Sequence, residues 1–139
     1  MVDDTPCACN NLRRAARAIT AVYDSALAPV GLRNSQFGVL RRLQRRGPLD
    51  VTQLAAEFEL DRSTMGRNLD PLERRGLISL KIGDDQRQRV ARLTSAGVAA
   101  IKSALPRWRA AQARVEATVA PASIDRLADR LAALRADSA

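Results

Sequence analysis

The spacing of the apolar residues changes at Gly76, and this change limits the folds that are open to the chain. Before Gly76, apolar residues recur every three or four positions, which is the period of an amphipathic helix. After it, Ile78, Leu80 and Ile82 alternate with polar residues, GDDQ predicts a turn, and RVARLT then runs back. This pattern therefore predicts a β-hairpin over residues 77–93. The chain is expected to be mainly α-helical (α+β) with this one small hairpin.

Helices are predicted on both sides of the hairpin. Their approximate ranges are 9–28, 34–46, 51–58, the segment 61–77, 94–119 and 124–134. Asp61 and Thr94 stand at N-cap positions, where a side-chain oxygen accepts a free N–H of the first turn. Asp50 and Gln53 have the spacing of a capping box. The helix starts are therefore marked in the sequence itself.

This order of elements predicts a winged helix-turn-helix over residues 34–94, in which the hairpin is the wing. The helix within residues 1–33 and the helices within residues 95–139 lie outside it. They carry apolar stripes that nothing obvious in one chain would cover. We therefore expect these flanking helices to form the dimerisation region of a homodimer.

The charge of the chain suggests its partner. The 139 residues include 23 basic and 15 acidic ones, which gives a formal net charge of +8. Such an excess favours a polyanionic partner, here double-stranded DNA. A genome-wide bias towards arginine would explain part of the excess equally well.

Several other classes of protein are disfavoured. The chain contains no histidine, which rules out His-based catalysis and imidazole zinc sites, and it has no phosphate loop or nucleophile elbow. We expect no enzyme, no cofactor and no metal. The start MVDDTPCACNN does not read as a signal peptide, and no apolar run approaches the ~20 residues of a membrane helix. A cytoplasmic protein without membrane contact is expected.

The segment DRSTMGRNLDPLERRGL, residues 61–77, has the residues that a helix in the major groove needs. Polar side chains on the first turns of such a helix reach base edges. The candidates are Arg62, Ser63, Thr64, Arg67 and Asn68. Arg67 has the geometry to bind guanine and Asn68 to bind adenine, whereas Met65, Leu69 and Leu72 would anchor the opposite face. The alternative is an ordinary surface helix with a solvated polar face.

The hairpin tip GDDQRQR carries Arg87 and Arg89. An arginine on a projecting wing suits a narrow minor groove. Asp85 is placed to hold the guanidinium of Arg87. A solvent-exposed turn with charges for solubility is the alternative, and the occurrence of a helix-turn-helix just before the wing makes it less favoured.

These segments resemble the MarR family of bacterial transcriptional regulators over about residues 8–136. The most specific part is DQRQRVARLTSAG, in which Asp85, Arg87, Leu93, Thr94 and Gly97 have the spacing of the family's wing. The resemblance implies a homodimer, built from the first helix and the last two, that binds a pseudo-palindromic operator. It also implies action usually as a repressor, with release or retuning by a small-molecule effector or an oxidant.

Carried over residue by residue, the resemblance places four side chains in the major groove: Ser63, Thr64, Arg67 and Asn68. It places Arg87 in the minor groove, with Asp85 positioning it. The chain departs from the family pattern in three places, and the first is a wing about one residue shorter than the common pattern. Arg33 stands where the family often has a capping Thr, and Pro71 lies inside the recognition helix.

Cys7 and Cys9 lie at the entrance to the first helix, in a region that is similar to the hydroperoxide-sensing branch of the family. A thiol at a helix N-terminus is suited to oxidation. The tyrosines that activate the thiol in that branch are absent, because Asn34 and Phe37 occupy the neighbouring positions. Three roles for Cys7 and Cys9 therefore stay open. They are oxidant sensing by the thiols, packing of two small side chains at a helix start, and a zinc site shared across a dimer.

One further alternative concerns the partner of the protein rather than the signal that releases it. A winged-helix protein-interaction module would use the same basic face to bind an acidic protein, without sequence-specific DNA binding. Salt dependence would not separate the two hypotheses, whereas a preference for one DNA sequence would.

Overall fold

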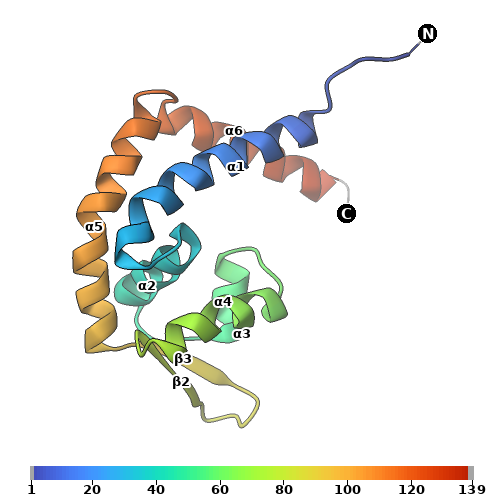
Figure 1. Ribbon diagram of the computed structural model, residues 1–139. Coiled ribbons are helices and arrows are strands. Elements are labelled where there is room, and N and C mark those ends of the chain that lie inside the picture. The colour runs from blue at the N-terminus through green and yellow to red at the C-terminus, as the bar shows by residue number, and fades with distance from the viewer. Residues whose placement is uncertain (1, 138–139) are drawn as a thin grey trace.

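The computed structural model describes residues 2–137, and its architecture is that of the predicted winged helix-turn-helix with flanking helices (Figure 1). The elements in chain order are α1 (Ala8–Leu27), the 3-10 turn η1 (Ala28–Val30), α2 (Asn34–Arg46), β1 (Leu49–Asp50), α3 (Val51–Glu57), α4 (Arg62–Arg74), β2 (Ile78–Ile82), β3 (Arg89–Leu93), α5 (Ser95–Glu116) and α6 (Pro121–Asp137). The predicted fold class, mainly α with a small β wing, is confirmed.

The chain has two parts, which we call the lobe and the arm. The lobe comprises α2, α3, α4 and the sheet, and the arm comprises α1, α5 and α6 (Figure 1). Helix α1 packs along α5, and both of these helices contact α2. The predicted break between the last two helices falls slightly earlier than expected, because α5 ends at Glu116 and α6 already begins at Pro121. None of the helices in the described part of the chain is long and apolar enough to cross a membrane.

The sheet has three strands rather than the two that the sequence predicts. Strand β3 lies in the middle, antiparallel to both neighbours, and Leu80 of β2 and Leu49 of β1 are both paired with Ala91. Strand β1 is only two residues long, so it has no alternating pattern that would reveal it. Because β1 runs directly into α3, it joins the base of the wing to the helix-turn-helix.

The core of the lobe is formed by aliphatic side chains of α2, α3 and α4. Met65, Leu69 and Leu72 of α4 are completely buried, and they pack with Leu40 and Leu54 in one cluster. Burying a side chain of this size stabilises a fold by about 1.5–3 kcal/mol. The prediction that these three residues anchor α4 is confirmed. Pro71 lies inside α4 without ending it.

The predicted helix caps are present. The carboxylate of Asp50 accepts the N–H of Gln53 at 2.7 Å, and the Gln53 side chain accepts the N–H of Asp50 at 3.0 Å. The hydroxyl of Thr94 accepts the N–H of Gly97 at 3.0 Å and donates to the carbonyl of Gly76 at 2.6 Å. Each bond satisfies a backbone group that a helix end leaves free.

Gly97 has a steric reason to be glycine. A Cβ at this position would lie 2.2 Å from the carbonyl oxygen of Leu77, which is closer than real Cβ contacts come. The same carbonyl accepts the N–H of Thr94 at 3.2 Å. The Leu-Thr-x-x-Gly pattern therefore fixes the start of α5 against the base of the wing.

An aromatic cluster joins the lobe to the arm. The ring of Trp108 in α5 lies 6.1 Å from Tyr23 of α1 and 6.1 Å from Phe37 of α2, measured between centroids. The guanidinium of Arg41 lies 4.9 Å from the Trp108 centroid, within cation–π range. Burial, and secondarily the charge of Glu116, raises the pKa of Tyr23, so this phenol stays neutral.

Candidate nucleic-acid interface

Helix α4 presents a polar face to solvent opposite its buried face. Ser63 and Arg67 are exposed, Thr64 and Asn68 are partly exposed, and Arg67 donates to the hydroxyl of Thr64 at 3.3 Å. These four predicted groove-facing residues lie together within the first two turns of α4. Their polar atoms can therefore reach a partner that covers this face.

The start of α4 is fixed by Asp61. Its carboxylate accepts the N–H of Thr64 at 2.8 Å and the hydroxyl of the same residue at 2.7 Å. These two bonds lower the pKa of Asp61, and the charge of Arg67 lowers it further. The capped first turn holds the polar side chains that follow in one orientation.

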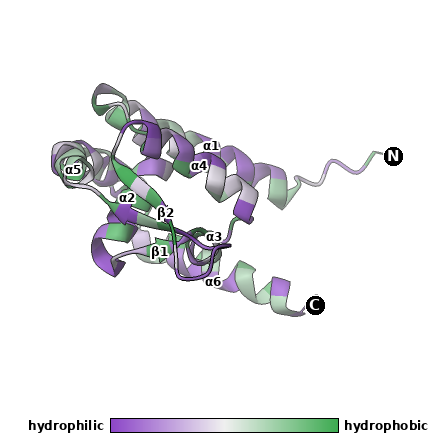
Figure 2. Ribbon diagram, turned by 90° about the horizontal axis from the view of Figure 1, so that it is seen from below, coloured by the Kyte–Doolittle hydropathy of each residue, from purple (hydrophilic) through white to green (hydrophobic). Residues whose placement is uncertain are grey.

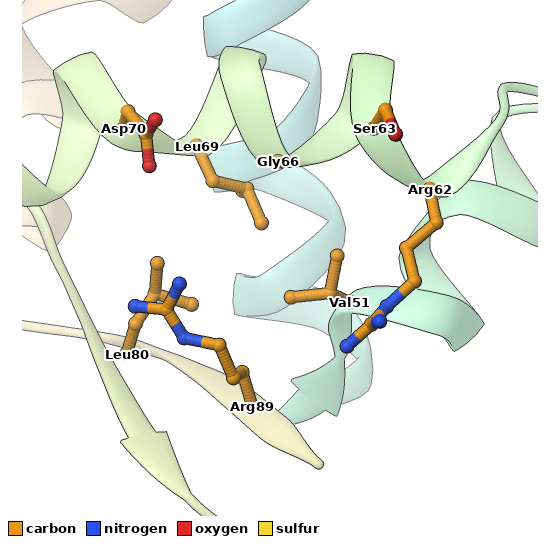
Figure 3. A pocket seen from close by; sticks show the side chains of 8 residues that line it. All are labelled: Val51, Arg62, Ser63, Gly66, Leu69, Asp70, Leu80 and Arg89. Carbon is orange, nitrogen blue, oxygen red and sulfur yellow. The ribbon is translucent and has the colours of Figure 1, made fainter. Parts of the chain in front are cut away.

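The structure places Arg62 apart from the other four candidates. Its guanidinium Nη2 donates to the backbone carbonyl of Arg87 at the wing, at 3.3 Å. Figure 3 shows the side chain extending away from α4 beside Val51, on the side of a hollow between α4 and the sheet. We therefore interpret Arg62 as a contact between the recognition helix and the wing, and its role as a base reader stays a prediction.

The hollow has an apolar floor and charged sides, formed by two arginines and one aspartate (Figure 3). It has a volume of about 320 Å³, and the residues lining it are Val51, Arg62, Ser63, Gly66, Leu69, Asp70, Leu80 and Arg89. Arg89 lies on β3 and its guanidinium points into the hollow, so Arg89 is not on the outer edge of the wing (Figure 3). A DNA backbone that passes between a groove-bound helix and a groove-bound wing would meet these two arginines.

The wing tip is ordered by Asp85 in a way that the sequence does not predict. The Asp85 carboxylate accepts the backbone N–H of Arg87 at 3.0 Å, and its carbonyl accepts the N–H of Gln88 at 2.8 Å. The prediction that Asp85 holds the guanidinium of Arg87 is therefore wrong for this structure. In the described part of the chain the ion pairs are those of Glu57 alone, and the Arg87 side chain is exposed at the tip.

Sequence reasoning missed the role of Glu57. This residue ends α3 and forms ion pairs with Arg42 and with Arg46, the latter at 2.8 Å, so that it joins α3 to α2. Arg42 also lies 4.9 Å from the Phe58 ring centroid. Arg42 and Arg46 thus hold the lobe together and Arg41 lies over Trp108 of the arm, so these arginines of α2 do not form a free basic face. Side-chain spacing along α2 gave no signal of this, because Glu57 lies on another helix.

The departure at Arg33 is compensated by two other side chains. The Gln36 side chain accepts the N–H of Arg33 at 3.0 Å, and Asp24 of α1 accepts the N–H of Asn34 at 2.7 Å. The start of α2 is thus capped without a threonine. Gln36 stands at the position of a capping-box residue and was a readable signal, whereas Asp24 acts through the tertiary structure.

The cysteines do not pack at the start of α1. Cys7 precedes the helix and Cys9 is its second residue, and both are free and exposed in this chain. The interpretation of Cys7 and Cys9 as semi-buried packing residues is therefore wrong here. No group of His, Cys, Asp and Glu in residues 2–137 is arranged to hold a metal ion.

Comparison with known proteins agrees with this geometry. Residues 32–88 match the model of the MarR family. The Mycobacterium tuberculosis transcriptional regulator MosR, in a crystal structure with DNA, is 38% identical over 94% of this chain and 98% of that chain, with a TM-score of 0.85. A second MosR structure is 35% identical over 99% and 100% of the two chains, with a TM-score of 0.80.

Two other relatives are more distant. CouR from Rhodococcus jostii RHA1, bound to p-coumaroyl-CoA, is 25% identical over 88% of this chain and 87% of that chain, with a TM-score of 0.72. The HTH-type transcriptional regulator YwoH of Bacillus subtilis is 28% identical over 85 residues, which are 61% of this chain and 62% of YwoH. The chain thus spans less than two thirds of YwoH.

These likenesses, with the wing and the exposed face of α4, define a winged helix-turn-helix DNA-binding regulator. The chain belongs to the MarR family of transcriptional regulators. The fold and the family are those of transcription regulators rather than of enzymes.

The contact of Arg62 with the wing leads to a testable expectation. Replacing Arg62 with Ala should weaken DNA binding through the wing, so its effect should largely disappear when Arg87 is already Ala. We expect a coupling energy above ~0.5 kcal/mol in the double-mutant cycle, because Arg62 binds the backbone carbonyl of Arg87 and would act through the position of the Arg87 side chain. The measurement is fluorescence anisotropy with a duplex that the protein selects from a randomised library.

Arg67→Ala provides the matched control for this cycle. The Arg67 side chain lies on the outward face of α4. The binding free energy lost in Arg67→Ala should therefore add to that lost in Arg87→Ala within ~0.5 kcal/mol. Additive losses for Arg62 and Arg87 would contradict a shared contact and would favour a separate DNA contact for Arg62.

Proposed function

We propose that the protein is a homodimeric repressor that binds a pseudo-palindromic operator. Helix α4 of each copy enters the major groove, and Arg87 at each wing tip enters the neighbouring minor groove. The observation that carries this proposal is the separation of two surfaces on one chain. A polar helix face and a basic wing lie on the lobe, whereas most of the exposed large apolar residues lie on the arm (Figures 1 and 2), with Leu60 and Ile82 as exceptions on the lobe.

The arrangement of the lobe supports a division of labour on DNA. The exposed side chains of α4 that can distinguish bases are Arg67 and Asn68, which match the donor and acceptor patterns of guanine and adenine. Arg62 and Arg89 lie beside the hollow between helix and wing, where a phosphate backbone would run. Specificity would thus come from α4, and much of the affinity from the basic side chains around it.

The decisive experiment is selection from a randomised duplex library, followed by anisotropy measurements at two salt concentrations. Enrichment of one palindromic sequence that binds at least ~10³-fold more tightly than scrambled DNA would support the proposal. Equal, salt-sensitive binding to every duplex would overturn it and would favour the alternative of an acidic protein partner.

Replacing Arg67 or Asn68 with Ala should cost roughly 1–3 kcal/mol of binding free energy on the selected duplex and relax the preference at one base pair of each half-site. Arg67 is exposed and Asn68 is partly exposed, and neither belongs to the buried core side chains of α4, so the protein should still fold. Anisotropy against single-base-pair variants of the duplex measures this. An equal loss on every variant would assign the residue to the phosphates instead.

The arm supports the dimer. Helix α6 has no buried residue in this chain, although it carries Ile124, Leu127, Leu131 and Leu134, which are 36–60% exposed. An apolar groove of about 390 Å³ lies between α1 and α5, with Ile19 and Val115 among its lining. Apolar surface of this kind on a helix that packs against little of its own chain is typical of an interface between copies.

Leu131→Asp should therefore convert the dimer to a monomer, because a carboxylate in an apolar interface loses its hydration. Sedimentation velocity measures the assembly, and affinity for the two-half-site duplex should fall with it. Arg130→Ser is the matched control, since it changes the neighbouring polar residue of the same helix and should leave a dimer. A monomeric wild-type protein, or a dimeric Leu131→Asp variant, would contradict this assignment of the interface.

Release by an oxidant is favoured by one specific observation. Both thiols of the chain are exposed, and they stand at the start of α1, the helix that lines the apolar groove of the arm. Peroxide would convert such a thiol to a sulfenic acid and would itself be reduced to water. Release by a small molecule is the alternative, in keeping with the groove in this chain and with the ligand bound to CouR.

Hydrogen peroxide should release the selected duplex from the wild-type protein, and dithiothreitol should restore binding. The Cys7→Ser/Cys9→Ser double variant should bind the duplex equally well and should not respond. Anisotropy with and without peroxide measures both proteins. Release that persists in the double variant would exclude the thiols as the trigger, and a search for apolar ligands of the groove would follow.

A further inference from the structure

Arg75, the residue after α4, contacts a distant part of the chain. Its guanidinium donates through Nη1 to the backbone carbonyl of Gly31 and through Nη2 to that of Val30, at 3.5 Å. Both carbonyls belong to the short connection between α1 and α2. The planar fork of a guanidinium can bind two acceptors at once, which a lysine ammonium does with less geometric control.

Gly31 is shaped to receive this contact. Its backbone has a φ of +73°, a conformation that favours glycine, and its N–H donates to the carbonyl of Ala28 at 2.9 Å to close the η1 turn. A Cβ at Gly31 would lie 3.2 Å from Nη2 of Arg75. The turn and the guanidinium therefore fit each other closely, and a Cβ at Gly31 would press on the guanidinium.

The same connection also holds the start of α2, another helix of the lobe. Asp24, in the last part of α1, accepts the N–H of Asn34 at the start of α2 at 2.7 Å. Leu27 and Leu32, on either side of η1, are buried in the core. Residues 24–32 thus form a fixed joint between arm and lobe, and Arg75 attaches the C-terminal end of α4 to that joint.

We propose that Arg75 is a positioning residue that sets the orientation of α4 relative to the arm, and hence the half-site spacing that the dimer accepts. This inference rests on the proposed dimeric repressor. The arm joins the two copies, so the tilt of α4 on each joint fixes the distance and the rotation between the two recognition helices. Without the contact, the C-terminal end of α4 keeps its buried residues but loses its polar attachment to the joint.

The geometry of DNA makes this testable. Half-sites read by the two recognition helices of a dimer lie about one helical turn apart, ~34–36 Å, or a multiple of it, and one added base pair rotates one half-site by ~36°. A rigid dimer should therefore discriminate strongly between spacings. A dimer whose α4 helices are less firmly held should tolerate the change.

The experiment uses the full-length protein and a series of duplexes built on the sequence that the wild type selects, with the centre shortened or lengthened by one base pair. We expect the wild type to lose at least ~10-fold in affinity on either change, a penalty of the size that a mismatched base pair carries. Arg75→Ala should bind the original spacing more weakly and should show a penalty below ~3-fold. Arg75→Lys should lie between the two.

Arg74→Ala is the matched control. Arg74 is the preceding residue and is exposed. Its replacement by Ala removes the same charge as Arg75→Ala but leaves the contact with the joint in place. Its spacing profile should equal that of the wild type. Circular dichroism melting checks that all variants are folded.

The outcomes separate the inference from the function on which it rests. An unchanged spacing profile in Arg75→Ala, with or without a uniform loss of affinity, would overturn the positioning role and leave the DNA-binding function standing. A flattened profile that Arg74→Ala shares would also overturn it, because charge alone would then explain the effect. If the wild type selects no sequence, the proposed function fails and this inference fails with it.

Discussion

The structure depends on the burial of one face of α4. Met65, Leu69 and Leu72 are completely buried against the helices of the lobe, and their spacing fixes the rotation of α4 about its own axis. Because the helix cannot rotate without exposing them, Ser63 and Arg67 must face outwards. The hydrophobic effect therefore decides which side chains of α4 are available to a partner, although none of the buried residues could contact it.

The arginines of the chain divide into those that hold the protein together and those that remain available. Arg42 and Arg46 bind Glu57, Arg41 lies over Trp108, and Arg75 binds the connection after α1. Arg67 and Arg87 remain on the exposed face of the lobe. A net charge of +8 therefore overstates the basic surface of the lobe that is available to DNA.

The two ends of α4 are attached to different parts of the molecule. At its N-terminal end Arg62 reaches the wing, and just beyond its C-terminal end Arg75 reaches the joint with the arm. Helix α4 thus adds a second connection between wing and arm, besides the direct passage of β3 into α5. Under the proposed function, a change at the arm, whether an oxidised thiol or a ligand in the groove, would reach α4 through this joint.

The sequence by itself determined the helices, their caps, the hairpin and the anchoring face of α4, because these follow from local hydrogen bonds and from the period of the apolar residues. Only the tertiary structure decided the partners of the long charged side chains. Asp85 binds the backbone of the wing turn instead of a guanidinium, Arg62 turns to the wing, and β1 pairs despite being two residues long. Charged side chains are long, flexible and without a period, so their partners are set by which elements the core brings together.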